Sequence, residues 1–167
     1  MLKPGDKAPS FKLKTTAGGE ISSPDLKGRK YVLYFYPKDD TPGCTREACD
    51  FRDNLVRLRK EGVEVLGVSK DSLAAHEKFR KKYDLPFELL SDEGNAVARA
   101  YGAYGEKTMY GKKVLGTIRS TYLIDENGRV DAVWSPVKVD GHVVRVLEHL
   151  RGGAAAPAAK KKAAKKK

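Results

Sequence analysis

The stretch Tyr31-Val-Leu-Tyr-Phe-Tyr-Pro-Lys-Asp-Asp-Thr-Pro-Gly-Cys-Thr-Arg-Glu-Ala-Cys49 contains both cysteines of the chain and its clearest fold signal. Its first six residues are apolar or aromatic and uncharged, which predicts a buried strand. A turn follows, after which Thr41 suits the N-cap and Pro42 the first position of a helix. Cys44 is therefore expected in the first turn of a helix that leaves a core strand, at the edge where active sites collect in open α/β sheets.

The pattern outward from this stretch alternates strands and helices. An Asn127-Gly128 turn between two apolar runs predicts a β-hairpin, and Gly18-Gly19 predicts another near the N-terminus. Helices are expected at residues 42–60, 73–83, 96–101 and 141–150, and strands at 11–15, 31–36, 63–68, 87–90, 121–124 and 130–134. This order predicts an α/β protein with a thioredoxin-like fold, in which helices flank a central mixed β-sheet.

Length and composition favour a single domain over residues 1–152. A chain of 167 residues with 40% apolar content can bury one ordinary core. No run approaches the length of a membrane span, and the first residues lack the apolar stretch of a signal peptide. A cytoplasmic protein with reduced cysteines is therefore expected.

Residues 153–167 form an Ala/Lys-rich segment whose lysines run from Lys160 to Lys167. Removing these six lysines from the formal net charge of +11 leaves +5. The segment has no aromatic or large apolar residue, so we expect a disordered basic tail. Two interpretations stay open: a tail that binds nucleic acid non-specifically through phosphates, and a solubilising extension.

A cysteine at a helix start is favoured as a thiolate, because unpaired N–H groups and the helix dipole place positive charge there. Lowering a thiol pKa from about 8.5 to about 6 raises the thiolate fraction roughly 30-fold at neutral pH. The accompanying loss of nucleophilicity is about tenfold or more. Ionisation of Cys44 alone therefore does not make a fast thiol catalyst.

Several motifs resemble the peroxiredoxins. Pro37-x-x-x-Thr-x-x-Cys44 is similar to their active-site signature, and Cys44-Thr-x-Glu-x-Cys49 is similar to the bacterioferritin-comigratory (Q-type) branch. Further matches in chain order are Asp6-x-Ala-Pro-x-Phe11, Gly105-Glu-Lys-x-Met-Tyr-Gly-Lys112 and Gly116-x-x-Arg-Ser-Thr-Tyr-Leu-Ile-Asp125. The resemblance covers roughly residues 3–150, and Tyr104 departs from it, because the family often has tryptophan there.

The resemblance implies a thiol peroxidase that reduces hydrogen peroxide and organic hydroperoxides in antioxidant defence. Cys44 would be the peroxidatic nucleophile, oxidised to a sulfenic acid, and Cys49 the resolving cysteine of an intramolecular disulfide. Thr41, Arg119 and Pro37 match the remaining active-site positions. Thioredoxin would be the reductant, with no cofactor and no metal. A monomer is expected, because an intramolecular resolving cysteine requires no partner subunit.

Donors aimed at the peroxide must supply most of the acceleration. Thr41 offers a hydroxyl, Gly43 and Cys44 offer free N–H groups, and Arg119 offers a permanently charged fork of donors. Glu47 lies one turn after Cys44, and two interpretations remain open for it. It pairs with Arg119 or Arg46, or it is a solvated carboxylate on the helix surface.

Three other interpretations of the cysteines are weaker. Two inert buried thiols would account for the pair without the surrounding motifs, but not with them. A thioredoxin-type dithiol reductase requires Cys-x-x-Cys, which is absent. A metal site is disfavoured, because His76, His142 and His149 have no ligand-like spacing to the cysteines.

The Cys44–Cys49 spacing constrains any disulfide between them. In an intact α-helix, residues five apart have Cα atoms about 8.7 Å apart. A disulfide requires a separation below about 7 Å. The bond therefore requires local unwinding of the helix.

Overall fold

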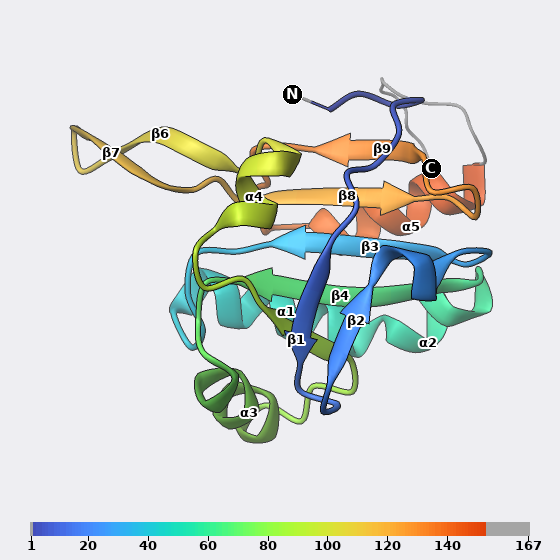
Figure 1. Ribbon diagram of the computed structural model, residues 1–167, viewed down its shortest axis with the longest axis horizontal. Helices are drawn as coiled ribbons and strands as arrows, with labels where there is room; N and C mark the ends of the chain where they lie inside the picture. Colours follow the sequence, from blue (N-terminus) through green and yellow to red (C-terminus); the bar gives the residue numbers. More distant parts are fainter. Residues whose placement is uncertain (1, 153–167) are drawn as a thin grey trace.

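The computed structural model describes residues 2–152 (Figure 1). The predicted basic tail, residues 153–167, lies outside the described residues. None of the helices in the described part of the chain has the length and apolar character needed to cross a membrane.

A seven-stranded mixed sheet forms the centre of the molecule, in the order β2-β1-β5-β4-β3-β8-β9. β4 pairs in parallel with both β3 and β5, and the other neighbours pair antiparallel. The strands are β1 (Lys12–Thr15), β2 (Glu20–Ser22), β3 (Lys30–Phe35), β4 (Val63–Ser69), β5 (Glu88–Ser91), β8 (Ser120–Ile124) and β9 (Val130–Trp134). A separate hairpin of β6 (Tyr104–Met109) and β7 (Lys112–Thr117) projects from one end of the sheet (Figure 1).

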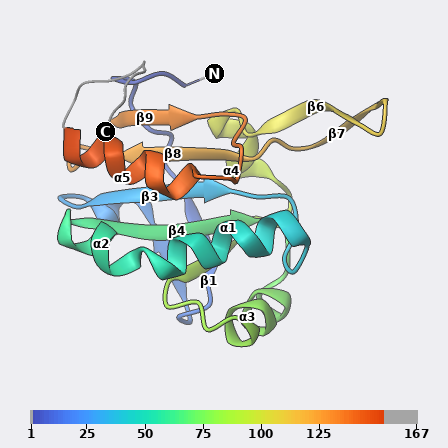
Figure 2. The ribbon, with the colours of Figure 1, turned by 180° about the vertical axis from the view of Figure 1, so that it is seen from behind.

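Helices cover both faces of this sheet. They are α1 (Pro42–Asp53), α2 (Leu55–Lys60), α3 (Leu73–Lys82), α4 (Ala96–Tyr101) and α5 (His142–Gly152), together with the 3-10 turn η1 (Ser23–Leu26). Figure 2 shows α1, α2 and α5 side by side on one face, and Figure 1 shows α4 on the opposite face. The predicted thioredoxin-like α/β fold with a mixed sheet flanked by helices is confirmed.

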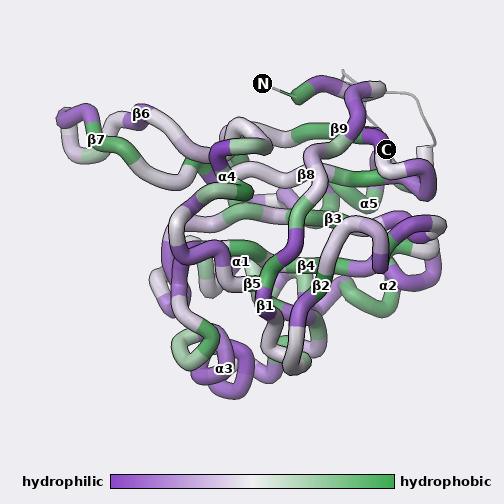
Figure 3. The backbone as a smooth tube through the Cα atoms, in the orientation of Figure 1, coloured by the Kyte–Doolittle hydropathy of each residue, from purple (hydrophilic) through white to green (hydrophobic). Residues whose placement is uncertain are grey.

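The sheet has an apolar core on each face, which explains why the residues of β3 do not alternate between apolar and polar. Val32 and Tyr34 pack into the core beneath α1, whereas Leu33 and Phe35 pack into the core beneath α4. A strand buried on both faces is apolar throughout, which is the pattern of residues 31–36. Figure 3 shows the contrast with α3, whose residues are mostly hydrophilic.

The predicted single helix over residues 42–60 is wrong, because the chain forms α1 and α2 with a break at Asn54. The Asn54 side chain donates to the Asp50 carbonyl at 2.8 Å, and its N–H donates to the Phe51 carbonyl at 3.2 Å. An asparagine that bonds locally to the backbone competes with the helical hydrogen-bond ladder, and here it ends α1. The break leaves both cysteines within α1.

Candidate active site

The loop from β3 to α1 places Cys44 where the sequence predicts it. Thr41 has the extended backbone of an N-cap residue, with φ −99° and ψ 156°, and Pro42 opens α1. The Thr41 hydroxyl does not cap the helix; it donates to the Lys38 carbonyl at 2.9 Å. Among the described residues, the N–H groups of Gly43 and Cys44 have no hydrogen-bond acceptor. Two donors and the positive end of the helix dipole therefore remain beside the Cys44 sulfur.

Arg119 connects Cys44 to a buried carboxylate. Its Nη2 lies 3.4 Å from Cys44 Sγ, and its Nη1 donates to Glu47 Oε1 at 2.7 Å. Arg119 lies between β7 and β8, and its carbonyl accepts a hydrogen bond from the Val137 N–H at 2.9 Å. The fork of the guanidinium thus spans the thiol and the carboxylate, with 18% of the side chain exposed.

The structure decides between the two interpretations of the Glu47 carboxylate. Its side chain is fully buried and pairs with Arg119, so a solvated surface carboxylate is wrong. The helical stripe of Cys44, Ala48 and Phe51, all buried, also contains position 47. That stripe is the sequence signal that indicates burial of Glu47.

Burial and charge shift the pKa values in this cluster. Burial raises the pKa of Glu47 to about 7, against the opposing effect of the Arg119 charge and hydrogen bond. Burial lowers the pKa of Arg119, but Glu47 and the Cys44 thiolate raise it, and the net change is upward. Arg119 therefore stays charged next to the sulfur, while the charge on Glu47 depends on pH.

Cys49 lies on the same helix as Cys44, and both thiols are free. Cys44 is buried, whereas Cys49 is half-buried. Burial raises the pKa of Cys49, and Arg52 opposes that shift. Pro37 is half-buried in the loop that leads to Thr41. The structure thus brings Cys44 and Arg119 together and places Pro37, Thr41 and Cys49 on the adjoining loop and helix.

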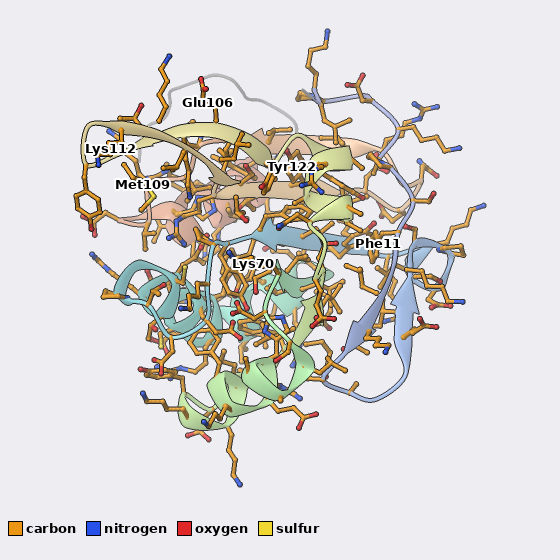
Figure 4. The ribbon with its side chains drawn as sticks, turned by 60° about the vertical axis from the view of Figure 1, so that its left-hand side comes forward. Phe11, Lys70, Glu106, Met109, Lys112 and Tyr122 are labelled. Atoms are coloured by element: carbon orange, nitrogen blue, oxygen red, sulfur yellow. The ribbon has the colours of Figure 1, made fainter. Side chains whose placement is uncertain are left out.

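The motif at residues 105–112 belongs to the β6–β7 hairpin, which sequence reasoning did not assign to strands. Figure 4 shows Glu106, Met109 and Lys112 spread along this hairpin. Lys107 lies in the middle of β6, and its Nζ reaches back to the base of the hairpin, where it donates to the Thr117 carbonyl at 2.6 Å. Burial lowers the pKa of Lys107, as does the charge of nearby Arg119. Its ammonium group is therefore a second cation near the site.

One cluster of metal-ligating types occurs among the described residues. Candidate ligand atoms of Asp39, Asp71 and His76 all lie within 4.8 Å of one another. His76 Nδ1 and Asp39 Oδ2 are 2.7 Å apart, a hydrogen-bond distance. Two ligands on one tetrahedral zinc would lie about 3.3 Å apart, given metal–ligand bonds of about 2.0–2.1 Å. The cluster fits a hydrogen-bonded network better than a metal site.

Comparison with known proteins agrees with the geometry. Residues 4–133 match the AhpC/TSA family. The chain is 56% identical over 149 residues to a putative peroxiredoxin bcp of Coxiella burnetii, covering 89% of this chain and 99% of that protein. It is 46% identical over 147 residues to peroxiredoxin Bcp of Bacillus subtilis, covering 88% and 94%.

Solved structures show the same likeness. A structure of Xanthomonas campestris peroxiredoxin Q superposes with a TM-score of 0.81 at 43% identity, covering 87% of this chain and 92% of that one. A mutant of Xylella fastidiosa PrxQ superposes with a TM-score of 0.85 at 35% identity, covering 91% and 97%. Another X. campestris structure was described in connection with alkyl peroxide reduction by the bacterioferritin comigratory protein.

Proposed function

The chain belongs to the AhpC/TSA family, among the peroxiredoxins of the Bcp and Q type, and from this premise we propose a two-cysteine catalytic cycle for it. In this cycle Cys44 is the peroxidatic cysteine and Cys49 the resolving cysteine. The observation that carries the proposal is the position of the Arg119 guanidinium, 3.4 Å from Cys44 Sγ at the start of α1.

The first step oxidises Cys44. Its thiolate attacks the terminal oxygen of a hydroperoxide, the O–O bond breaks, and the electron pair leaves on the distal oxygen as an alkoxide or hydroxide. A proton from solvent completes the alcohol or water, and Cys44 becomes a sulfenic acid. Negative charge moves from sulfur to the leaving oxygen, so fixed donors next to the sulfur stabilise the transition state more than the ground state.

Three groups are proposed to supply these donors. Arg119 keeps its charge and presents several N–H groups, and the free N–H groups of Gly43 and Cys44 share the same helix start. The Thr41 hydroxyl donates to the Lys38 carbonyl and would turn to a bound substrate. Pro37, which has no N–H group, would limit access of water without competing as a donor.

The second step forms the disulfide. The Cys49 thiolate attacks the sulfenic sulfur of Cys44, and hydroxide leaves and is protonated to water. Both residues lie in α1, where Cα atoms five residues apart are about 8.7 Å from each other, beyond the limit of about 7 Å for a disulfide. The first turns of α1 must therefore unwind between the two steps.

A dithiol protein must reduce the disulfide to complete the cycle, and we propose thioredoxin in that role, acting on a monomer in the cytoplasm. Organic hydroperoxides are proposed as substrates beside hydrogen peroxide, supported by the alkyl peroxide reduction described for the X. campestris relative. Two free thiols in one helix suit a reducing compartment.

The test is peroxide consumption coupled to thioredoxin and its reductase. Wild type should turn over, and Cys44→Ser should lose all turnover. Cys49→Ser should undergo one oxidation and then stall. Continued turnover by Cys44→Ser would overturn the proposal. Equal multiple turnover by Cys49→Ser with thioredoxin would remove the resolving role while leaving Cys44 in place.

A further role in nucleic-acid binding is proposed for the lysines from Lys160 to Lys167, because the sequence there is rich in lysine and free of acids. If all six lysines neutralised phosphates, log K would fall against log salt with a slope of about −5. A gel shift across salt concentrations, with and without residues 154–167, tests this role. Loss of the shift on tail removal supports it, and an equal shift without the tail contradicts it.

A further inference from the structure

The loop between β3 and α1 is anchored through Asp39, a residue that the peroxidase chemistry does not use. Asp39 is buried, and its carboxylate and N–H group all have partners. Oδ1 accepts from the Tyr36 hydroxyl at 2.6 Å, and Oδ2 faces His76 Nδ1 at 2.7 Å. The Asp39 N–H donates to Asp71 Oδ2 at 2.9 Å. The residue lies two positions after Pro37 and two before Thr41, so it fixes the middle of the loop that carries both.

The partners of the His76 ring show how many protons Asp39 and His76 share as a pair. The ring is fully buried on α3, and its Nε2 faces the Leu90 carbonyl at 2.9 Å. A carbonyl only accepts, so Nε2 carries a hydrogen. One further proton lies between Nδ1 and Asp39 Oδ2, on either atom. The pair therefore has no net charge in either arrangement, and its hydrogen bonds attach the loop to α3.

Further contacts attach the same loop to the segment from Ser69 to Tyr83. Asp71 Oδ2 also accepts from the Ser69 hydroxyl at 2.5 Å. Asp40, whose φ is +58°, accepts from Lys82 Nζ at 2.8 Å and from the Tyr83 hydroxyl at 2.7 Å. A non-glycine residue in the left-handed region needs its surroundings to hold it there. The partners of Asp39 and Asp40 outside their own loop are Asp71 in the loop after β4, His76 and Lys82 of α3, and Tyr83 directly after α3, none of which is a reacting group of the proposed cycle.

We propose that Asp39 and His76 are positioning residues that hold the loop and thereby aim the Thr41 hydroxyl and the start of α1 at the peroxide. The pair keeps the loop fixed while α1 unwinds, so that the donors return to the same place when the helix re-forms. This inference rests on the peroxidase cycle proposed above and adds to it a named support outside the reacting groups.

A buried pair held only for stability would be a poor solution, because apolar side chains of similar volume often serve as well or better. The geometry here specifies more than burial does. A single carboxylate joins the end of β3 to α3, and the neighbouring backbone N–H joins the loop to Asp71. Loss of this carboxylate frees the loop that carries Thr41 into α1, and a displacement of about 1 Å at a reacting site can cost about 100-fold in rate.

The experiment compares two reactions of Cys44 in the same set of folded variants. Hydrogen peroxide needs the donors around the sulfur, whereas iodoacetamide needs only the thiolate. The variants are Asp39→Ala, Asp39→Asn and Ser72→Ala, each in the full-length protein, and circular dichroism confirms folding. Ser72 caps α3 by accepting a 3.2 Å hydrogen bond from the Ala75 N–H, and among the described residues its side chain makes no hydrogen bond to the loop. It is the control for simple weakening of α3.

Asp39→Ala should lower the peroxide rate constant by about tenfold or more, while alkylation changes by less than about threefold. Asp39→Asn should recover most of the peroxide rate, because its amide donates to Nδ1 of neutral His76 and its carbonyl still accepts from Tyr36. Ser72→Ala should leave the ratio of the two rates as in wild type. If Asp39→Ala does not fold, His76→Gln serves in its place, with the same selective loss expected.

Three results would overturn the positioning role: a wild-type peroxide rate in folded Asp39→Ala, an equal fall in both rates, or the same selective loss in Ser72→Ala. Each of these is measured beside an active wild type. A wild-type protein that consumes no peroxide would instead overturn the peroxidase cycle itself, so the two failures are distinguishable.

Discussion

Replacement of Glu47 by glutamine should change the pH dependence of stability in a predictable direction. The carboxyl group has an ordinary pKa of 4.5, and burial raises it to about 7 in the folded protein. The folded state therefore holds the proton more tightly than the unfolded state. An acid with a raised folded pKa destabilises the protein progressively as pH rises from the unfolded value toward the folded one.

The magnitude follows from the two pKa values. The folded and unfolded pKa values of Glu47 differ by about 2.5, which corresponds to about 3 kcal/mol in the free energy of unfolding. Wild type loses most of this stability between pH 5 and pH 8. A glutamine side chain cannot ionise, so the Glu47→Gln variant escapes this loss while the amide carbonyl still accepts from Arg119. The free energy of unfolding of the variant, relative to that of wild type, should therefore rise by about 2 to 3 kcal/mol from pH 5 to pH 8. This corresponds to roughly 5 to 10 °C in Tm.

Urea unfolding at a series of pH values measures this gain. Both proteins carry Cys44→Ser, which removes titration of the thiol, and Glu148→Gln makes the same chemical change on the exposed face of α5. A stability difference that stays constant with pH would refute the argument that burial dominates at Glu47. If wild type instead became more stable relative to the variant as pH rises, the Arg119 ion pair would outweigh the cost of burying the charged carboxylate.

Three further predictions concern the cycle. Arg119→Lys should lower the peroxide rate by about tenfold or more in stopped-flow assays, because one ammonium cannot span Cys44 and Glu47; an unchanged rate would remove the role of the fork. Gly43→Ala should stabilise α1 by up to about 1 kcal/mol and slow disulfide formation up to about fivefold in quenched alkylation. Its Cβ would lie 3.2 Å from Arg119 Nη2 and press on the guanidinium, so the peroxide rate should also fall; unchanged peroxide and resolution rates would contradict the two kinetic effects. Amides of residues 44–52 should exchange faster in the disulfide form, and equal protection would argue against unwinding.

Local signals made the strand, the turn and the helix start predictable from the sequence. Tyr31, Tyr34 and Phe35 are core residues, as expected, and the hairpin around Asn127-Gly128 forms β8 and β9. These features depend on residues close together in the chain, where turn chemistry and hydrophobic pattern act directly. The position of Arg119 was predictable only through its motif, because the contact with Cys44 joins residues 75 apart.

Features set by distant contacts or by one side chain escaped prediction. The Asp39–His76 bond spans 37 residues; the helical spacing of His76 and Phe79 indicates burial of the ring, but no local pattern indicates that Asp39 is its partner. The β6–β7 turn has positive φ at both Tyr110 and Gly111, and tyrosine is an unusual residue for that conformation. The break at Asn54 depends on a choice between backbone partners that helix propensity does not resolve.

The packing of α1 limits how far the helix needs to open for resolution. Phe51 is fully buried, stacks on Tyr34 with ring centroids 4.6 Å apart, and meets the His142 ring edge-on at 6.0 Å. Exposing a buried phenylalanine would cost about 2 to 3 kcal/mol, so an opening that leaves Phe51 in place is favoured. Cys44 and Cys49 both precede Phe51, so unwinding need not pass it.

The two ends of the opening segment therefore differ in how they are held. On the N-terminal side, the loop is anchored by Asp39 to α3, and on the C-terminal side Phe51 is anchored between Tyr34 and His142. Between them lie Gly43, which weakens the first turn, and Glu47, whose burial is costly once it is charged. In the proposed cycle, oxidation of Cys44 would add an oxygen to a sulfur that is already buried beside Arg119. In the proposed cycle, the segment between these two anchors is the one that moves to bring Cys49 to Cys44.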